Sequence, residues 1–385
     1  MRLLLINSKF LPIVGGGETY ILELIDYFVR RGWDVHLATS RSTSRLRHHH
    51  KATIHYLDGF DDARLEIAAS IPGMRRLLDE LAPDVVHVHN VMPYFIYSSI
   101  TSKNEFPTVL TIHNTPELPY RLFGSFKDFR AECLFITELL GNGHFQKLLF
   151  GSQYYLDSYS VAAPWIKRLG VAEVAHFFPP KLTTDGVSNA MLDYDDSKQI
   201  RLLFPSRILK RKGIEEALQA VSLLPKSYCL VLPGFAASED KEYLTFISYE
   251  IQRLGITDQV EYTTEIVTPE HMPHYYKTSH IALVPSHYEG FGIVAVEAMT
   301  CGLPVITTGV GGLGEVITHE SNGLIVPAKN PKQLADSIIR IVSDNNLRLK
   351  IVEGARKTVV ERFGYQRHMD QVERVYAEVL DATNR

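Results

Sequence analysis

The sequence predicts an α/β protein made of two doubly wound, Rossmann-like domains. Short apolar runs that end in polar residues alternate with stretches of helical period, which is the pattern of βαβ units. This series starts twice, first at Leu3 and again at Arg201. A chain of 385 residues is also too long for one compact domain and suits two domains of about 150–200 residues each.

The first half opens on an apolar run at residues 3–6, as expected of a parallel strand that is buried on both faces. A run of three glycines and then a helical period follow it. Further strands are predicted at 34–39, 84–89, 107–113 and 148–152, with a helix at 94–99. From residue 178 to residue 198 the chain is polar and contains two prolines but no apolar period, so this stretch is predicted to be a linker.

The second half repeats the pattern. Its strands are predicted at 201–205, 228–232, 260–263, 280–285 and 304–307, with a helix at 293–301 and a charged amphipathic helix at 365–380. Gly302 and Pro304 end the helix at 293–301, because glycine adopts positive φ and proline cannot continue the helix. Two similar α/β halves predict a cleft where the carboxyl ends of both sheets meet, and ligands usually bind in such clefts.

Composition excludes several classes of protein. A net charge of −4 with 22% charged residues gives no basic face for nucleic acid. No run approaches the roughly 20 apolar residues of a membrane span, and the N-terminal apolar run is too short for a secretory signal. The three cysteines, Cys133, Cys229 and Cys301, lie far apart in apolar runs, so they are expected to be buried free thiols in a reducing compartment. We expect a cytoplasmic protein with at most peripheral membrane contact.

The most informative stretch is residues 285–305, which read PSHYEGFGIVAVEAMTCGLPV. Seven residues separate Glu289 from Glu297, which places them on the order of 10 Å apart if the turn and helix between them are regular. That separation exceeds the ~5.5 Å between the two carboxyl groups of a retaining glycosidase. The N–H groups of the helix start between them attract phosphate. Two carboxylates with a phosphate-binding helix start between them suit one elongated ligand that has hydroxyls at both ends and phosphates in the middle. A nucleotide sugar is such a ligand.

This stretch resembles the E-x7-E signature of family 4 of the retaining glycosyltransferases, which have the two-domain GT-B fold. The resemblance continues through GGLGE at 311–315 and NGLIVP at 322–327, and milder matches cover most of the chain. It implies an acceptor-binding domain at 1–178, a linker at 179–199 and a nucleotide-sugar-binding domain at 200–364. The last segment, 365–385, is then a helix that crosses back onto the first domain.

The resemblance also implies which residues bind the donor's diphosphate. Arg207 and Lys212 match the family's R-x4-K pair, in which a planar fork and a point charge neutralise the departing diphosphate. The other matches are Gly15 and Gly16 beside the distal phosphate, Gly234 in a phosphate-proximal turn, and the helix start at Phe291, Gly292 and Ile293.

Three further residues are implied to contact the sugars of the donor. Glu297 would accept hydrogen bonds from the ribose hydroxyls, Glu289 from the hydroxyls of the transferred sugar, and His113 would position the sugar ring. No D-x-D stands near a strand end, which argues against a required divalent metal, and no cofactor is implied. Because the chain offers no obvious nucleophile, the resemblance suggests front-face attack, with a donor phosphate oxygen taking the acceptor proton.

Each motif also has a simpler structural interpretation. The triple glycine at 15–17 is equally consistent with a tight turn, and a lone histidine such as His113 is more often structural. His87 and His89 alternate on one strand face and are expected to be packed or hydrogen bonded. Lys210 and Arg211 are expected to form an exposed basic turn.

Two other patterns suggest ligands that we reject or place second. The run G-x-G-x-x-G at 309–314 comes late in a domain and lacks an acidic residue about 20 positions later, so NAD binding is rejected. A basic, histidine-rich cluster at 41–51 lacks zinc-ligand spacing and is expected to be a solvated loop. Contact of this cluster with an anionic membrane or a phosphorylated acceptor is the second interpretation.

These residues predict a retaining transfer of a hexosyl unit, of glucosyl or N-acetylhexosaminyl type, from a nucleotide diphosphate sugar to an acceptor hydroxyl. UDP is the favoured nucleotide. Departures from the family pattern at Ser206, Asn114 and Thr264 leave the base and the sugar open. The alternatives are a GT-B sugar-nucleotide epimerase and a non-catalytic nucleotide-sugar-binding protein.

The acceptor is predicted to contact first-domain loops at 115–143. Acidic residues in this segment would suit a cationic amino sugar or an aminocyclitol, although exposed helix charges explain them equally well: Glu117, Asp128, Glu132 and Glu138. Lipid-linked sugars, polysaccharides and natural products also remain open as acceptors.

Overall fold

The structure is a computed structural model, and the chain in it forms two compact units. The first unit comprises Met1–Phe177 and Gln366–Arg385, and the second comprises Phe178–Tyr365. The residues described are 1–8, 10, 16–40, 48–49, 51–60, 67–113, 141, 143–168, 170–178, 194, 199–234, 241–263, 267 and 271–383. Within these ranges, no helix is both long enough and apolar enough to cross a bilayer.

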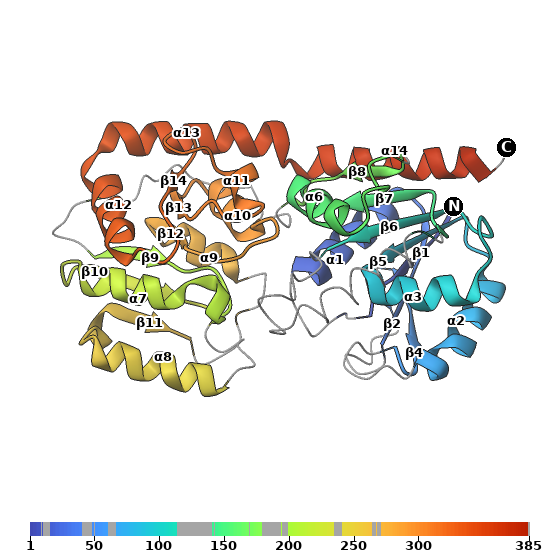
Figure 1. The fold of residues 1–385 in the computed structure, drawn as a ribbon, viewed down its shortest axis with the longest axis horizontal. Helices are drawn as coiled ribbons and strands as arrows, with labels where there is room; N and C mark the ends of the chain where they lie inside the picture. The colour runs from blue at the N-terminus through green and yellow to red at the C-terminus, as the bar shows by residue number, and fades with distance from the viewer. Residues whose placement is uncertain are drawn as a thin grey trace. The chain divides into compact units, whose positions relative to one another are not determined.

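The first unit is built on a sheet with the strand order β3-β4-β2-β1-β5-β6-β7-β8 (Figure 1). Its strands are β1 (Arg2–Ile6), β2 (Asp34–Ser40), β3 (His48–His49), β4 (Ala52–Leu57), β5 (Val85–His89), β6 (Thr108–Ile112), β7 (Lys147–Phe150) and β8 (Ala172–Val174). All neighbouring strands pair in parallel except β3 and β4. The strand order reverses between β1 and β5, and ligands of doubly wound sheets bind at such a reversal.

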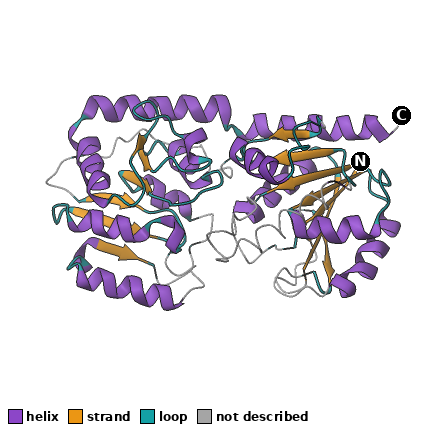
Figure 2. Ribbon diagram, viewed as in Figure 1, coloured by secondary structure: helices purple, strands orange, loops and turns teal. Residues whose placement is uncertain are grey.

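Helices pack against this sheet (Figure 2). Of those in the described residues, four come from the first half of the sequence and one is the C-terminal helix. They are α1 (Gly16–Arg30), α2 (Ile67–Leu81), α3 (Val91–Ile100), α6 (Gln153–Ala162) and α14 (Tyr365–Thr383). The C-terminal helix α14 lies along β8, where Gln371 donates to the Val174 carbonyl over 3.1 Å and Arg374 pairs with Glu173 at 2.7 Å. The C-terminal helix therefore packs on the first unit, as predicted.

The second unit has a fully parallel sheet with the order β11-β10-β9-β12-β13-β14. Its strands are β9 (Ile200–Leu203), β10 (Tyr228–Leu232), β11 (Val260–Tyr262), β12 (Ile281–Val284), β13 (Val305–Thr307) and β14 (Leu324–Ile325). Its helices are α7 (Ile214–Ser222), α8 (Lys241–Arg253), α9 (Met272–Lys277), α10 (Ile293–Thr300), α11 (Leu313–Val316), α12 (Pro331–Ser343) and α13 (Asn345–Arg362). In this sheet the order reverses between β9 and β12.

The apolar runs of the sequence form these strands, because a parallel strand covered by helices on both faces must be apolar on both. Each of the ten strands predicted from such runs is present, with its ends shifted by three residues or fewer. The two units bury separate apolar cores. Cys229 and Cys301 are buried free thiols as predicted, whereas Cys133 lies outside the described residues.

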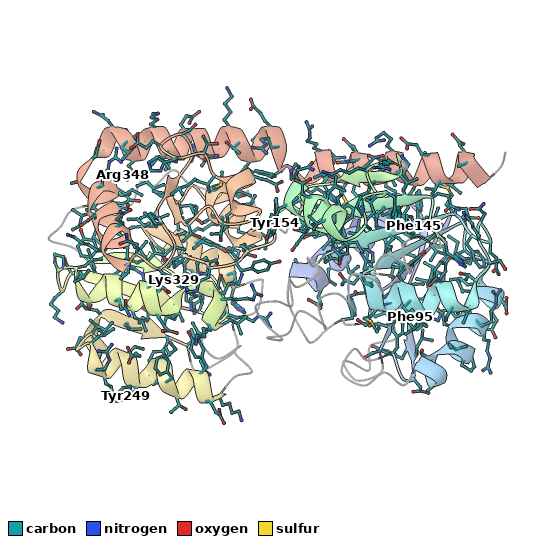
Figure 3. The ribbon with its side chains drawn as sticks, in the orientation of Figure 1. Phe95, Phe145, Tyr154, Tyr249, Lys329 and Arg348 are labelled. Atoms are coloured by element: carbon teal, nitrogen blue, oxygen red, sulfur yellow. The ribbon has the colours of Figure 1, made fainter. Side chains whose placement is uncertain are left out.

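The predicted linker lies mostly outside the described residues, but Tyr194 is described. Its hydroxyl donates to the His280 carbonyl at 2.5 Å. The guanidinium of Arg348, labelled in Figure 3 on α13, lies 3.8 Å from the centre of the Tyr194 ring. These contacts anchor this part of the chain to the second unit.

Candidate functional site

The second-unit residues that were predicted to bind the diphosphate group lie around the strand-order reversal of that unit. The loop after β9 and the loop after β12 leave the carboxyl ends of neighbouring strands. Gly213 has φ of 76°, and a Cβ atom there would lie 2.0 Å from the Pro285 carbonyl oxygen. The N–H of His287 donates to the Arg211 carbonyl over 2.8 Å. The two loops therefore pack backbone against backbone.

This packing brings Lys212 and Glu289 into an ion pair. Each side chain is only 13% exposed, so the pair is shielded from water. Burial lowers the pKa of Lys212, and the neighbouring Arg211 and Arg207 lower it further, while Glu289 opposes the shift. The pair combines a cation with a carboxylate from loops that are 77 residues apart in sequence.

Arg207 lies in the same loop and is exposed. It acts electrostatically on Lys212, so the two predicted diphosphate ligands belong to one cationic cluster. Lys210 and Arg211 are also exposed, on a short 3₁₀ turn from Lys210 to Lys212, which confirms the prediction of an exposed basic turn. Lys212 differs from these neighbours because its ammonium group is turned into the protein.

Gly234 has a structural role in the same region. A Cβ atom at Gly234 would lie 2.3 Å from the Ser206 carbonyl oxygen. Its lack of a side chain therefore lets the loop after β10 lie against the loop after β9. Whether Gly234 also contacts a phosphate remains a prediction.

The glycine run at 309–314 packs against the loop that carries Glu289. The N–H of Gly312 donates to the Glu289 carbonyl over 3.0 Å, and a Cβ atom at Gly312 would lie 2.1 Å from the Gly290 carbonyl oxygen. Gly292 has φ of 92°, and a Cβ atom there would lie 2.4 Å from Leu313 Cδ2.

The motif glycines themselves are also explained by structure. Gly309 and Gly311 have positive φ, and a Cβ atom at Gly314 would lie 3.0 Å from the Gly309 carbonyl oxygen. Backbone conformation and packing therefore account for the G-x-G-x-x-G pattern without a dinucleotide.

We expect Gly312→Ala to destabilise the second unit by a few kcal/mol and to displace Glu289. Gly312 has an ordinary φ of −65°, so the cost is a steric clash with backbone and not a dihedral cost. Gly73→Ala is the matched control, because a Cβ atom on this α2 glycine would meet only Leu57 Cδ2 at an ordinary 3.4 Å. Calorimetric unfolding of both variants checks this, and equal unfolding temperatures would contradict it.

The helix start at Phe291, Gly292 and Ile293 is the beginning of α10, as predicted. The Phe291 side chain is buried and packs against Phe363 with ring centres 5.5 Å apart. Its ring is therefore part of the core, and only its main chain is suited to meet a phosphate. The first N–H groups of any α-helix lack partners within the helix, which makes this start suitable for an anion.

Glu297 lies one turn further along α10 and is hydrogen bonded to a residue that the sequence did not single out. The Tyr276 hydroxyl, on α9, donates to Glu297 Oε2 over 2.5 Å. Burial raises the pKa of Glu297 to about 7, although the Tyr276 hydrogen bond favours the ionised form. One carboxylate oxygen is thus occupied within the protein, and Oε1 is the one suited to a ligand.

The raised pKa of Glu297 predicts a pH-dependent stability. Because its folded pKa of about 7 lies above the ordinary 4.5, the folded state holds this proton more tightly than the unfolded chain. The stabilisation is complete below pH 4.5 and is lost as pH rises through 7. Glu297→Gln should therefore stabilise the second unit by roughly 2–3 kcal/mol at pH 8, and by much less at pH 5.

Calorimetry at both pH values measures this difference. Glu353→Gln, at an exposed position of α13, is the control and should change little at either pH. A gain from Glu297→Gln that is the same at pH 5 and pH 8 would contradict the prediction.

In the first unit, His113 lies immediately after β6 and is held on several sides. Its backbone N–H donates to Asn90 Oδ1 over 3.0 Å, and its ring Nε2 lies 2.9 Å from His89 Nδ1. Phe177 stacks on the ring at 5.1 Å with an angle of 3° between the planes, and Tyr20 meets it edge-on at 5.1 Å. His113 is therefore locked in one orientation.

His113 is partly accessible and belongs to a cluster with three buried histidines, His87, His89 and His368. His87 Nδ1 and Nε2 lie 2.6 Å from the Tyr376 hydroxyl and from Thr111 Oγ1, and His368 Nε2 lies 2.9 Å from the Tyr20 hydroxyl. Burial lowers the pKa of all four, to about 3 for His113, to about 4 for His368 and well below the ordinary value for His87 and His89. These rings are neutral at physiological pH, so His113 is suited to hydrogen bonding and not to supplying charge.

The structure places the remaining predicted residues as follows. Gly16 begins α1, as its place between a strand and a helix predicts, while Gly15 lies outside the described residues. The predicted acceptor segment 115–143 and the basic cluster 41–51 also lie almost entirely outside them. His87 and His89 are hydrogen bonded within the protein, as predicted.

Sequence reasoning missed Tyr276, Asn90, His368 and the supporting role of His89. The only available signal was that His89 and Asn90 end one strand and His113 ends the next strand of the sheet. Carboxyl ends of adjacent parallel strands meet, so this juxtaposition could have been predicted. In the described part of the chain, no group of three or more His, Cys, Asp or Glu residues is arranged to hold a metal.

Comparison with known proteins places the chain in a family. The model of the glycosyl transferases group 1 matches residues 195–358, and the model of Glycosyltransferase Family 4 matches residues 14–155. A D-inositol 3-phosphate glycosyltransferase of Xylanimonas cellulosilytica is 26% identical, over 94% of this chain and 92% of its own length. An N-acetyl-alpha-D-glucosaminyl L-malate synthase of Bacillus anthracis is 24% identical, over 96% of this chain and 95% of its own.

Solved structures agree on the fold. Sucrose-phosphate synthase from Thermosynechococcus elongatus superposes with a TM-score of 0.79 at 21% identity, over 99% of each chain. HepE of Anabaena, in complex with UDP-glucose, superposes with a TM-score of 0.79 at 19% identity, over 99% of this chain and 100% of its own. Together with the two family models and the full-length relatives, this shows that the chain belongs to glycosyltransferase family 4 and is a GT-B glycosyltransferase that uses a nucleotide-sugar donor.

Proposed function

We propose that this enzyme transfers a hexosyl unit, of glucosyl or N-acetylhexosaminyl type, from a UDP-sugar to an acceptor hydroxyl with retention of configuration. The observation that carries the proposal is the shielded Lys212–Glu289 pair beside Arg207, at the strand-order reversal of the second unit. Such a crevice is where doubly wound domains bind nucleotides. The complex of HepE with UDP-glucose, and the glucosaminyl transfer named for the Bacillus relative, favour this class of donor.

In this proposal, the cationic cluster stabilises the leaving diphosphate. As the bond between the sugar C1 and the β-phosphate oxygen breaks, Arg207 and Lys212 would meet the developing negative charge. The N–H groups at the start of α10 would add to this stabilisation, with Gly15, Gly16 and Gly234 beside the phosphates. Groups that act on charge which appears only in the transition state raise kcat.

The carboxylates would orient the two sugars of the donor. Glu289 would accept from hydroxyls of the transferred sugar while it remains near Lys212, and Glu297 Oε1 would accept from the ribose. The acceptor oxygen would then form its bond to C1 on the face that the diphosphate leaves. Its proton would pass to an oxygen of the leaving diphosphate, so that no protein nucleophile and no metal is needed.

We further propose a small hydroxylated acceptor. The curated relatives are named for D-inositol 3-phosphate and for L-malate, which are small compounds with a hydroxyl and an anionic group. Aminocyclitols and amino sugars are the cationic counterparts that the acidic residues of 115–143 would suit. The relatives thus favour an anionic acceptor, and the acidic residues of this chain favour a cationic one. An assay with acceptors of both charges distinguishes the two.

A binding screen followed by a transfer assay tests this function. Thermal-shift measurements with UDP-, GDP- and ADP-sugars should show the largest stabilisation with a UDP-hexose. Product analysis by NMR should then show an α-linked product from an α-linked donor, in the presence of EDTA. Inversion of the anomeric centre would overturn the retaining mechanism, and loss of activity in EDTA would overturn metal independence.

The same assay separates the alternatives. An epimerase would convert the sugar nucleotide without an acceptor, and a non-catalytic binding protein would neither transfer the sugar nor slowly hydrolyse the donor. The acceptor panel should contain inositol phosphate, malate, an aminocyclitol and an amino sugar.

A further inference from the structure

The hydrogen bond between His89 and His113 carries an inference about which atom His113 presents to a ligand. The two rings meet through His89 Nδ1 and His113 Nε2, 2.9 Å apart. Both rings are neutral, since burial lowers both pKa values. A neutral imidazole has one N–H and one lone pair, so one ring donates and the other accepts.

The opposite nitrogen of His89 decides between the two arrangements. His89 is fully buried, and its Nε2 has no hydrogen-bond partner among the residues that the structure describes. If His89 accepted through Nδ1, its proton would sit on Nε2 as a buried N–H without a partner. If His89 donates through Nδ1, only a lone pair is left without one. Unpaired buried N–H groups are rarer than unpaired acceptors, so the second arrangement is favoured.

The same bond then determines the tautomer of His113. Because His113 Nε2 accepts from His89, its proton is on Nδ1. His113 Nδ1 has no hydrogen-bond partner in the described part of the chain, and the side chain is partly accessible. Stacking on Phe177 and the edge contact with Tyr20 hold the plane of the ring, and the bond between His89 Nδ1 and His113 Nε2 fixes which ring nitrogen faces His89.

We propose that His89 is a positioning residue that keeps His113 as the Nδ1–H tautomer, so that His113 offers the substrate an N–H donor and not a lone pair. This inference rests on the proposed function in one respect, namely that His113 contacts the transferred sugar. It names the chemistry of that contact: the sugar must supply an oxygen that accepts a hydrogen bond. A sugar that is deoxygenated at the contacted position should then be a poor donor.

The neighbours of His89 suit this positioning role. The centres of the His87 and His89 rings are 4.1 Å apart. Both ring nitrogens of His87 are hydrogen bonded, one to the Tyr376 hydroxyl and the other to the Thr111 hydroxyl. Tyr376 comes from α14, so its hydrogen bond to His87 ties the C-terminal helix to β5, the strand that carries both histidines. Packing against the His87 ring therefore holds the His89 ring where its Nδ1 meets His113 Nε2.

A measurement on the wild-type protein tests the tautomer without any substrate. Long-range ¹H–¹⁵N correlation spectra of protein labelled with [¹⁵N]histidine distinguish the two neutral tautomers, and the His113 signals are those missing from His113→Asn. We expect the Nδ1–H pattern for both His89 and His113. An Nε2–H pattern for His113 would overturn the proposal, whether or not the chain uses a UDP-sugar.

Kinetics of two His89 variants test the positioning role. His89→Asn places an amide N–H near the position of the imidazole Nδ1–H, whereas His89→Phe keeps the ring and removes the donor. We expect His89→Phe to lose about tenfold in kcat/KM, the value of one hydrogen bond of about 1.4 kcal/mol. His89→Asn should retain activity within about threefold of the wild type, and its His113 spectrum should remain that of Nδ1–H.

A double-mutant cycle separates positioning from a merely structural effect. In a His113→Ala background, His89→Phe should cause no further loss, because its effect passes through His113. Additive losses, or equal losses in His89→Phe and His89→Asn, would overturn the role of His89. Monodeoxy donors complete the test. The hydroxyl that His113 contacts is the one whose removal costs the wild type but not the His113→Ala variant, and its removal should cost the His89→Phe variant little.

Discussion

Replacing Lys212 with alanine is expected to lower kcat/KM for sugar transfer by at least roughly ten- to hundredfold. A charge-assisted contact contributes about 1.5–3 kcal/mol, and ~1.4 kcal/mol corresponds to a factor of ten in rate. Lys212 is only 13% exposed, so little water competes for its ammonium group once a diphosphate replaces or joins Glu289. Arg207→Ala should lose activity on the same scale. Initial rates with the UDP-sugar identified by thermal shift measure both variants.

Lys210→Ala is the matched control. Lys210 lies two residues away on the same 3₁₀ turn, but its side chain is exposed, so its removal should leave kcat/KM near that of the wild type. Because Lys212→Ala also leaves Glu289 without its partner, the unfolding temperature of each variant must be measured beside its activity. Near wild-type turnover in Lys212→Ala would remove this residue from the mechanism.

Lys212 and Glu289 depend on each other for their charged states. Burial penalises the charged form of a lone lysine and lowers its pKa, as it does here. The Glu289 carboxylate opposes that shift and keeps the cation available. A double variant, Lys212→Met with Glu289→Gln, removes both charges from the pair. It should recover part of the stability that Lys212→Ala loses, without recovering activity.

The sequence predicted the two sheets because buried parallel strands are apolar throughout. β1, β10 and β12 read as nearly continuous apolar runs, β5 and β6 are rich in β-branched residues with histidines and threonines among them, and each of these strands is fully or almost fully buried. Four of the described strands were not predicted: β3, β4, β8 and β14. β3, β8 and β14 are two or three residues long and carry no period that distinguishes them from a loop, and β4 alternates buried and half-buried residues with polar ones among them.

The candidate site likewise has a part that the sequence could predict and a part that it could not. The residues predicted to bind the diphosphate lie in local motifs, so the sequence alone could suggest Arg207, Lys212 and the start of α10. Their supports come from elsewhere in the chain: Tyr276 from α9 for Glu297, and His89 from the neighbouring strand for His113. Contacts of this kind depend on strand order and helix placement, which no local spacing encodes.

Glycines show where the sequence was informative but ambiguous. A ligand or a neighbouring backbone can each require a residue without a side chain. For Gly213, Gly234 and Gly312 the structure supplies a backbone carbonyl at 2.0–2.3 Å from the position of a Cβ atom. Packing alone is therefore a sufficient reason for these glycines, whatever they contribute to the ligand.

The largest stability effect is expected in acid, where the first unit should lose several kcal/mol between pH 6.5 and pH 5. His87, His89, His113 and His368 have folded pKa values below the ordinary 6.5, so the unfolded chain takes up protons that the folded unit does not. The stability is therefore complete above pH 6.5 and falls as pH decreases. Each histidine contributes about 1.4 kcal/mol per pH unit, or about 2 kcal/mol at pH 5.

The loss should be a large fraction of the stability of a typical domain, because four residues contribute with the same sign. The sign is opposite to that of Glu297, so acid should weaken the first unit while it strengthens the second. Both tryptophans of the chain, Trp33 and Trp165, lie in the first unit, so their fluorescence reports on this unit alone. Urea unfolding followed by tryptophan emission from pH 8 to pH 5 measures the effect.

Removing one buried histidine should lower the slope of unfolding free energy against pH by about one proton. His368→Gln is suited to this test, because an amide can still meet the His176 carbonyl and the Tyr20 hydroxyl that His368 now contacts. His271→Gln, at an exposed position of the second unit, should leave the slope unchanged. Identical slopes in the two variants would show that His368 takes up its proton while folded, and would contradict the prediction for this residue.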